Sequence, residues 1–180
     1  MKGMVFTEFL EMVESEFGYE LLDRVVSVPG LSSEGAYTSV GNYPHTDMLA
    51  MLTELSAATE VPISELVFAF GKYLLVTFSR TNPEFFKEKA DALEFLEGID
   101  TVIHTEVLKL YSDVKLPSFD CERPSPNELI MRYQSQRPMA DLADGLIHQS
   151  AVYFKNDIEV IREAGPTGDA HSAVFRLRMQ

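Results

Sequence analysis

Residues 129–137, Leu-Ile-Met-Arg-Tyr-Gln-Ser-Gln-Arg, predict a β-strand in the C-terminal half of this chain. Because alternate side chains of a strand share one face, Tyr133, Ser135 and Arg137 would point the same way. Two hydroxyls and a guanidinium in one row suit a ligand with carboxylates, since arginine can bind a carboxylate through two hydrogen bonds. The same row also fits an exposed edge strand with polar residues on both faces. Strand geometry alone favours that second interpretation.

The sequence on either side of this strand predicts a sheet with helices. Downstream, the spacing of apolar residues predicts a helix over 139–154 and strands over 156–163 and 172–179. The Gly-Pro-Thr-Gly run at 165–168 is typical of a turn between the last two strands. Upstream, three prolines between residues 117 and 126 predict an extended connection.

The N-terminal half is predicted to be helical. Apolar side chains recur at helical spacing in six stretches, which are 2–17, 19–28, 47–59, about 62–79, a segment from 82 that is interrupted at Gly98, and 101–111. Thr46 and Asp100 are suitable N-caps for two of them, and the glycine-rich residues 29–44 predict a loop. The predicted fold class is α+β: a helical N-terminal subdomain, about residues 1–60, packs on an α+β subdomain, about 61–180, with a small antiparallel sheet.

His104 is the most informative single residue in the helical part. Residues three and four apart share a helix face, so His104 lines up with Val107, Leu108 and Tyr111. Neutral imidazole is a good iron ligand, and an apolar wall keeps the ring unprotonated. A buried histidine is more often hydrogen-bonded to the backbone, so spacing alone favours a structural role.

Charge and composition exclude several classes of function. The 180 residues carry a formal charge of -13, and such an acidic surface disfavours nucleic acids and anionic membranes as partners. The acidity fits plain solubility, and a basic protein partner is also compatible with it. No apolar run approaches the roughly 20 residues that span a bilayer, and acidic residues near the N-terminus interrupt any signal-like segment, so we expect a cytoplasmic protein. Cys121 is the only cysteine, which leaves no intramolecular disulfide and no cysteine-rich zinc site.

Together these motifs resemble the H-NOX family, the haem nitric oxide/oxygen binding domains related to the haem domain of soluble guanylate cyclase. The resemblance covers essentially the whole chain from Met1-Lys2-Gly3 onward. Its most specific motif is Tyr-x-Ser-x-Arg, which stands here at Tyr133, Ser135 and Arg137. The second is Asp-Thr-Val-Ile-His at 100–104, and weaker matches are Ala-Phe-Gly at 69–71 and Gly-Leu-Ile at 145–147. The order and spacing of the motifs favour the functional interpretations over the structural ones.

The resemblance implies a role for each motif residue. His104 would bind the iron of haem b, which would lie between the two subdomains. Tyr133, Ser135 and Arg137 would hydrogen-bond the haem propionates. Val5, Pro117 and Leu146 match positions that press on the porphyrin, and Leu74, Phe78 and Leu142 match distal or pocket-wall positions.

Two departures from the family pattern bear on ligand choice. Oxygen-binding members carry a distal tyrosine where this chain has Leu142, and bound oxygen benefits from a nearby hydrogen-bond donor more than nitric oxide does. The resemblance therefore implies binding of NO and CO with O2 excluded. Some relatives bind zinc through Cys and His near the C-terminal sheet. Here His171 has no cysteine beside it, so no zinc is expected.

The resemblance implies a bacterial gas sensor that signals by conformational change to a separate enzyme. That partner would be a histidine kinase or a cyclic-di-GMP synthase or phosphodiesterase. An enzyme is the first rival interpretation, but the chain has no G-x-S-x-G elbow and no P-loop, and the Asp144–His148 pair has no plausible nucleophile beside it. The second rival is a haem-free interaction module or a carrier of an apolar ligand.

Overall fold

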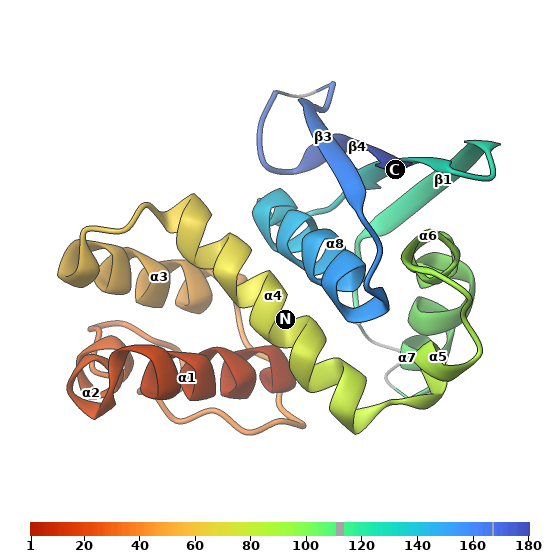
Figure 1. Ribbon diagram of the computed structural model, residues 1–180. Coiled ribbons are helices and arrows are strands. Elements are labelled where there is room, and N and C mark those ends of the chain that lie inside the picture. Colours follow the sequence, from red (N-terminus) through yellow and green to blue (C-terminus); the bar gives the residue numbers. More distant parts are fainter. Residues whose placement is uncertain (111–113, 167) are drawn as a thin grey trace. The chain divides into compact units, whose positions relative to one another are not determined.

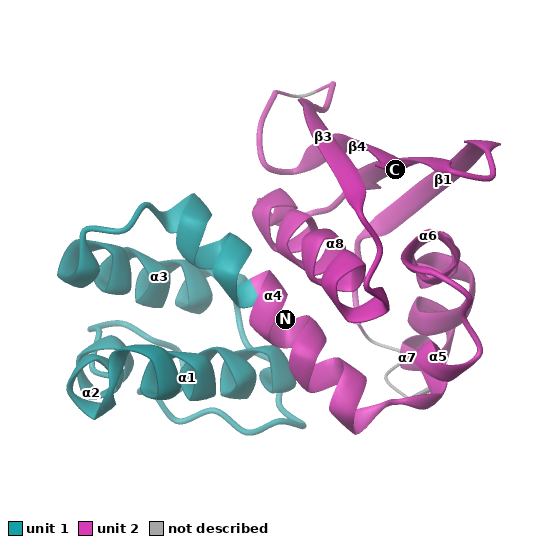
Figure 2. Ribbon diagram, viewed as in Figure 1, with its two compact units in different colours: residues 1–70 teal, residues 71–180 magenta. Residues whose placement is uncertain are grey.

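The computed structural model describes residues 1–110, 114–166 and 168–180 of the chain. The chain forms two compact units, Met1–Phe70 and Gly71–Gln180, which Figure 2 shows in two colours. Helix α4, Ile63–Thr81, begins in the first unit and ends in the second. Tyr111, predicted to share a face with His104, and Thr167 of the predicted turn lie outside the described residues.

Unit 1 consists of helices joined by a long loop (Figure 1). Its elements are α1 Gly3–Phe17, α2 Tyr19–Val26, α3 His45–Thr59 and the start of α4. The predicted apolar stripe of α1 is buried, with Phe6, Phe9 and Val13 fully so, because a helix presents one apolar face to its core. Phe9 also meets Phe70 of α4 edge to face, with 5.4 Å between the ring centroids.

Hydrogen bonds attach the loop between α2 and α3 to the start of α3 and to the start of α1. The Oδ2 atom of the buried Asp47, in the first turn of α3, accepts hydrogen bonds from the Ser32 backbone N–H, the Ser32 hydroxyl and the Tyr37 hydroxyl. At the start of α1, the N–H groups of Gly3 and Met4 donate to the carbonyls of Gly41 and Ser39. The loop thus satisfies N–H groups that have no partner inside the helix.

Unit 2 is built on a four-stranded antiparallel sheet in the order β1-β2-β4-β3 (Figure 1). The strands are β1 Ser118–Ser125, β2 Glu128–Gln134, β3 Ile158–Ala164 and β4 Ser172–Met179. The helical elements are α5 Glu84–Lys87, α6 Ala92–Glu97, the π-helical turn η1 Ile99–Ile103, α7 His104–Leu110 and α8 Ala140–Phe154. The α+β fold class is confirmed.

One face of the sheet forms the core of unit 2. Side chains of the central strands, among them Met131 and Phe175, pack with α6 and α8 in one hydrophobic cluster. The opposite face is polar and carries cross-strand ion pairs, such as Arg132 with Glu122 and Arg176 with Glu163. This alternation is typical of an antiparallel sheet that is covered on one side only.

Helices α4 and α8 approach each other backbone to backbone at Gly71. A Cβ atom at this glycine would lie 2.3 Å from the carbonyl oxygen of Leu142 and 3.1 Å from the Cα of Gly145. Only a residue without a side chain fits this contact. The contact brings Leu142 and Leu146 of α8 to the part of α4 that begins at Gly71.

Three predictions about local structure are wrong. The strand predicted over 129–137 ends at Gln134, because the N–H of Ser135 donates to His171 O as the chain leaves the sheet. The segment with three prolines is not merely a connection, since β1 occupies most of it as an edge strand, where proline is tolerated. The helix predicted over 101–111 is preceded by η1, and α3 begins at His45, so that neither Asp100 nor Thr46 is an N-cap.

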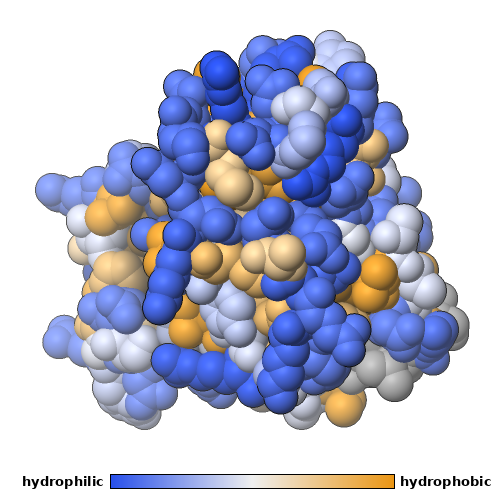
Figure 3. Space-filling model, turned by 45° about the vertical axis from the view of Figure 1, so that its right-hand side comes forward, coloured by the Kyte–Doolittle hydropathy of each residue, from blue (hydrophilic) through white to orange (hydrophobic). Residues whose placement is uncertain are grey.

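Among the described residues, no single helix is long and apolar enough to cross a membrane. Helices α3 and α4 are long and apolar enough only when they are taken together, and a bend of 111° separates them. On the face drawn in Figure 3, hydrophilic residues predominate and hydrophobic side chains form small patches among them.

Candidate functional site

His104 is the first residue of α7 and is held by a carboxylate from the preceding turn. Its side chain is 16% exposed, and its Nδ1 atom lies 2.6 Å from Oδ1 of Asp100. The second carboxylate oxygen, Oδ2, accepts a hydrogen bond of 2.7 Å from the backbone N–H of Phe119 in β1. Asp100 therefore contacts both the helix that carries the histidine and the edge strand of the sheet.

The protonation of His104 suits a metal ligand. Burial lowers the pKa of the imidazole below its ordinary value, and the charge and hydrogen bond of Asp100 oppose that shift. A neutral ring whose Nδ1–H donates a hydrogen bond to a carboxylate leaves the Nε2 lone pair available, which is the usual arrangement of a metal-binding histidine. Among the described residues, Nε2 has no hydrogen-bond partner.

The surroundings of His104 fit an axial ligand better than a site for a free ion. Within the described residues, no group of three or more His, Cys, Asp or Glu side chains could hold a metal. A free zinc ion needs three or four protein ligands, whereas iron within a porphyrin needs one axial histidine. A single histidine with an available Nε2 would fit the axial position of a haem, and His104 is the candidate for that role.

Aromatic rings connect His104 to the predicted Tyr-x-Ser-x-Arg motif. The ring of Phe119 lies 6.0 Å from that of His104 and 5.3 Å from that of Tyr133, between ring centroids. Tyr133 is 4% exposed and faces the core from β2. Burial raises the pKa of its hydroxyl, while the Ser135 hydroxyl and the charge of Arg137 act in the opposite direction. The three motif residues are thus brought together.

The motif is not a row on one strand, as the sequence predicted. Tyr133 lies in β2, but Ser135 and Arg137 lie beyond its end. The Ser135 hydroxyl accepts a hydrogen bond of 3.0 Å from the Arg137 N–H, and Arg137 Nη1 donates to the carbonyl of Lys115 at 2.8 Å. The chain bends after β2. This bend, and not the alternation of side chains along a strand, brings the three residues together. Arg137 retains further guanidinium N–H donors beyond the one used on Lys115.

The apolar residues predicted to line the site are partly exposed to solvent. All six are half-buried, namely Val5, Leu74, Phe78, Pro117, Leu142 and Leu146. Leu74 and Phe78 lie on α4, and Leu142 and Leu146 lie on α8. Pro117 directly precedes β1, and Val5 belongs to α1 in unit 1.

The contact between Asp100 and His104 is not among the predictions from sequence. An aspartate four residues before a histidine is a usable signal for it, since residues at that spacing share a helix face. Cys121, which lies next to this region on β1, is not a candidate nucleophile. Burial raises the pKa of its thiol to about 12, so the thiol stays protonated.

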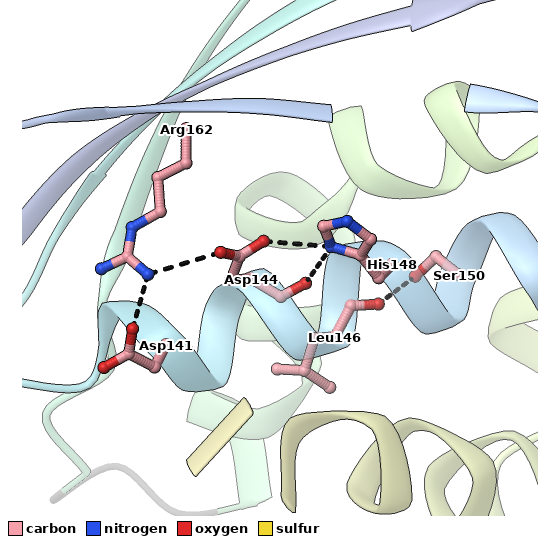
Figure 4. Close-up of polar contacts among 6 residues, drawn as sticks. All are labelled: Asp141, Asp144, Leu146, His148, Ser150 and Arg162. Atoms are coloured by element: carbon pink, nitrogen blue, oxygen red, sulfur yellow. Dashed lines mark hydrogen bonds and ion pairs between the residues drawn. The ribbon is translucent and has the colours of Figure 1, made fainter. Parts of the chain in front are cut away.

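A second Asp–His pair lies on α8 and is drawn in Figure 4. Asp144 Oδ1 and its backbone carbonyl each lie 3.0 Å from Nδ1 of His148, and Arg162 of β3 forms ion pairs with Asp141 and Asp144. The hydroxyl of Ser150 does not face His148. It is fully buried and donates to the carbonyl of Leu146, so these side chains do not form a catalytic triad.

The pair predicts a pH dependence of stability. The hydrogen bond that His148 donates to the side chain of Asp144 raises the pKa of His148, while burial and the charge of Lys72 on α4 act in the opposite direction. A raised pKa in the folded state stabilises the protein fully below the unfolded value of about 6.5, and this contribution is lost as the pH rises through the folded value. We expect His148→Gln to remove that part of the dependence.

The measurement is thermal unfolding of the wild type and His148→Gln over a pH series from below 6.5 to above the raised pKa. The melting temperatures of the two proteins should converge as the pH rises. A constant difference across the series would contradict the role of the protonated His148.

Comparisons with known proteins identify the family and the fold of the chain. The family model described as Haem-NO-binding matches residues 2–162. A comparison with curated protein sequences gave no match.

Solved structures of H-NOX proteins are similar to this chain over its whole length. The unliganded Fe(II) H-NOX protein from K. algicida has a TM-score of 0.92 and 35% identity, and the match covers 100% of this chain and 97% of that one. The H-NOX from Shewanella woodyi, solved with IWP-051 in the Fe(II)CO state, has a TM-score of 0.84, 42% identity and coverage of 100% and 95%. The H-NOX protein from S. oneidensis in the Fe(II)NO state has a TM-score of 0.90 at 24% identity, with coverage of 100% and 99%, and supports the fold alone.

Proposed function

Because the chain belongs to the Haem-NO-binding, or H-NOX, family of haem gas-sensor domains, we propose that it is a nitric oxide sensor that binds NO and CO and excludes O2. The observation that carries the proposal is the half-buried His104, whose Nδ1 lies against a carboxylate, whose Nε2 is available and whose pKa is lowered by burial. The haem would supply the ferrous iron to which the gas binds. The chain would supply the axial ligand and the walls of the site.

Each predicted residue has a task in this proposal. The hydroxyls of Tyr133 and Ser135 and the remaining N–H groups of Arg137 would hold the haem propionates, since these groups donate to carboxylates. Val5, Pro117 and Leu146 would press on the porphyrin. A second group would form the apolar wall, namely Leu74, Phe78 and Leu142.

Selectivity would follow from the side chain of Leu142, which cannot donate a hydrogen bond. Bound oxygen gains partial negative charge and is stabilised by a nearby donor, which is worth about 0.5–1.5 kcal/mol or more when charge assists. Nitric oxide needs little such help. An apolar residue at this position would therefore lower oxygen affinity more than nitric oxide affinity.

The sensor would act in the cytoplasm by changing the surface that it presents to a separate enzyme, and would not itself be an enzyme. The proposed partners are a histidine kinase or a cyclic-di-GMP synthase or phosphodiesterase. Such signalling is a shift between two conformations that bind the gas with different affinity. The two chain segments that meet at Asp100, the His104 helix and β1, are the parts of unit 2 best placed to move with the axial ligand.

The test is an absorption spectrum of the reduced protein under argon, then in air, then with nitric oxide. We expect a ferrous haem spectrum that air does not convert to an oxygen complex and that nitric oxide converts at once. A stable oxygen complex would contradict the proposed selectivity but keep the haem sensor. No haem band after reconstitution would contradict the sensor and favour a haem-free interaction module.

A matched pair of variants isolates the role of position 142. Leu142→Tyr adds a hydroxyl that Leu142→Phe lacks, while both rings occupy similar volume. We expect oxygen affinity to rise in the tyrosine variant relative to the phenylalanine variant. Equal affinities would show that this position does not face the bound gas.

A further inference from the structure

Asp100 uses its two carboxylate oxygens on two different elements of unit 2. Oδ1 lies 2.6 Å from Nδ1 of His104, and Oδ2 accepts from the N–H of Phe119 at 2.7 Å. The first contact stays within η1 and α7, while the second spans 19 residues of sequence to β1. A single side chain therefore joins the candidate axial ligand to the sheet.

The backbone around Asp100 is fixed as well. The N–H of His104 donates to the carbonyl of Ile99, five residues earlier, which is the hydrogen bond of a π-helical turn. The hydroxyl of Thr105 reaches the carbonyl of Asp100 at 3.3 Å. Single π-helical turns inside helices occur frequently at functional sites. The turn and these bonds hold the carboxylate beside the imidazole instead of leaving it in solvent.

The strand contact continues into the sheet. Phe119 pairs with Tyr133 across β1 and β2, and the rings of these residues lie next to each other. Any displacement of the His104 ring must therefore either carry Asp100 and the start of β1 with it or break one of two short hydrogen bonds. The carboxylate of the other Asp–His pair, on α8, reaches a strand only through a side chain, because Asp144 pairs with the guanidinium of Arg162 in β3.

We propose that Asp100 is the positioning residue of the axial ligand, which fixes the tautomer and orientation of His104 and links its movement to strand β1. The inference rests on the proposed function for the axial role of His104. Carboxylates that accept from a metal-binding histidine orient the ring and increase its basicity, and their loss typically weakens metal binding by about 10- to 100-fold. Asp100 would add a mechanical connection from the ligand to the sheet.

The first test uses the protein without haem, so that it stands apart from gas binding. In Asp100→Ala, nitrogen NMR should show that His104 shifts away from the Nδ1–H tautomer. The Phe119 amide should exchange its hydrogen about 10-fold faster or more, since it loses an acceptor that carries a charge. If Asp100→Ala keeps the wild-type tautomer of His104 and the wild-type exchange rate of the Phe119 amide, the inference is overturned.

The second test uses the haem protein and the conservative variant Asp100→Asn. We expect a lower iron–histidine stretching frequency in the Raman spectrum of the ferrous form, a higher reduction potential and haem loss faster by about 10- to 100-fold. Asp144→Asn is the matched control, because it changes the other Asp–His pair at the same spacing, and it should leave all three values unchanged. Circular dichroism checks that each variant is folded.

The two proposals fail in different ways. If the wild type takes up no haem, the sensor and the axial role of His104 are overturned, while the NMR measurement still decides whether Asp100 controls the imidazole. If the wild type binds haem and Asp100→Asn keeps its Raman frequency and potential, the sensor stands and the positioning role of Asp100 is overturned.

Discussion

Replacement of His104 by glycine is expected to give a protein that retains haem only when free imidazole is supplied. In the proposed site His104 is the axial ligand, and within the described residues no group of three or more His, Cys, Asp or Glu side chains could hold a metal in its place. Glycine removes the imidazole and leaves space of the same shape, next to Asp100 and Phe119. Imidazole from solution can occupy that space and donate the same hydrogen bond to Asp100.

The measurement is the ratio of haem absorption to protein absorption after purification with and without imidazole. We expect the ratio to be near zero without imidazole and near the wild-type value with it. His148→Gly is the control, because it removes the histidine of the other Asp–His pair, and it should retain haem in both buffers. Full retention by His104→Gly without imidazole would show that another residue is the ligand.

Replacement of Gly3 by alanine is expected to have the largest effect on stability. The Cβ atom would lie 1.8 Å from the carbonyl oxygen of Thr38 and 2.9 Å from the ring of Tyr43. The obstacle is backbone and cannot rotate away. Moving it would also break the hydrogen bonds by which Gly41 and Ser39 accept from the first turn of α1.

Overpacking a close contact costs about 1–3 kcal/mol and occasionally more, and the lost hydrogen bonds add about 1 kcal/mol each. We therefore expect the free energy of unfolding to fall by about 3 kcal/mol or more, as measured by denaturant titration. Gly98→Ala is the matched control, because Gly98 has a φ of -84° and a Cβ there would meet its nearest neighbour at 3.5 Å. A similar stability for both variants would contradict the tight contact at Gly3.

The sequence allowed the fold class and most elements to be predicted, because periodicity reports which side chains are buried. The stripe of α1 and the alternation of β4 are examples, and both elements lie where they were expected. Strand β1 was missed because its prolines suggested an irregular connection, and only the pairing with β2 defines it as an edge strand.

The residues of the candidate site could be predicted where they belong to a short sequence motif. Contacts between segments that lie far apart in the sequence could not. Tyr133, Ser135 and Arg137 do gather, but a bend after β2 brings them together, and the contact between Ser135 and His171 that forms the bend spans 36 residues. The link from Asp100 to Phe119 could not be read from spacing for the same reason. Whether the six apolar residues line the haem stays a prediction.

The backbone contact at Gly71 has a consequence for protein engineering. A library that aims to change gas preference would vary side chains along α4 and α8, where Leu74, Phe78 and Leu142 lie. Position 71 should be excluded from randomisation, because any added carbon would meet the carbonyl of Leu142 and force the two helices apart. With that codon held constant, the helix spacing is preserved across the library, and altered selectivity can be assigned to the chosen side chains.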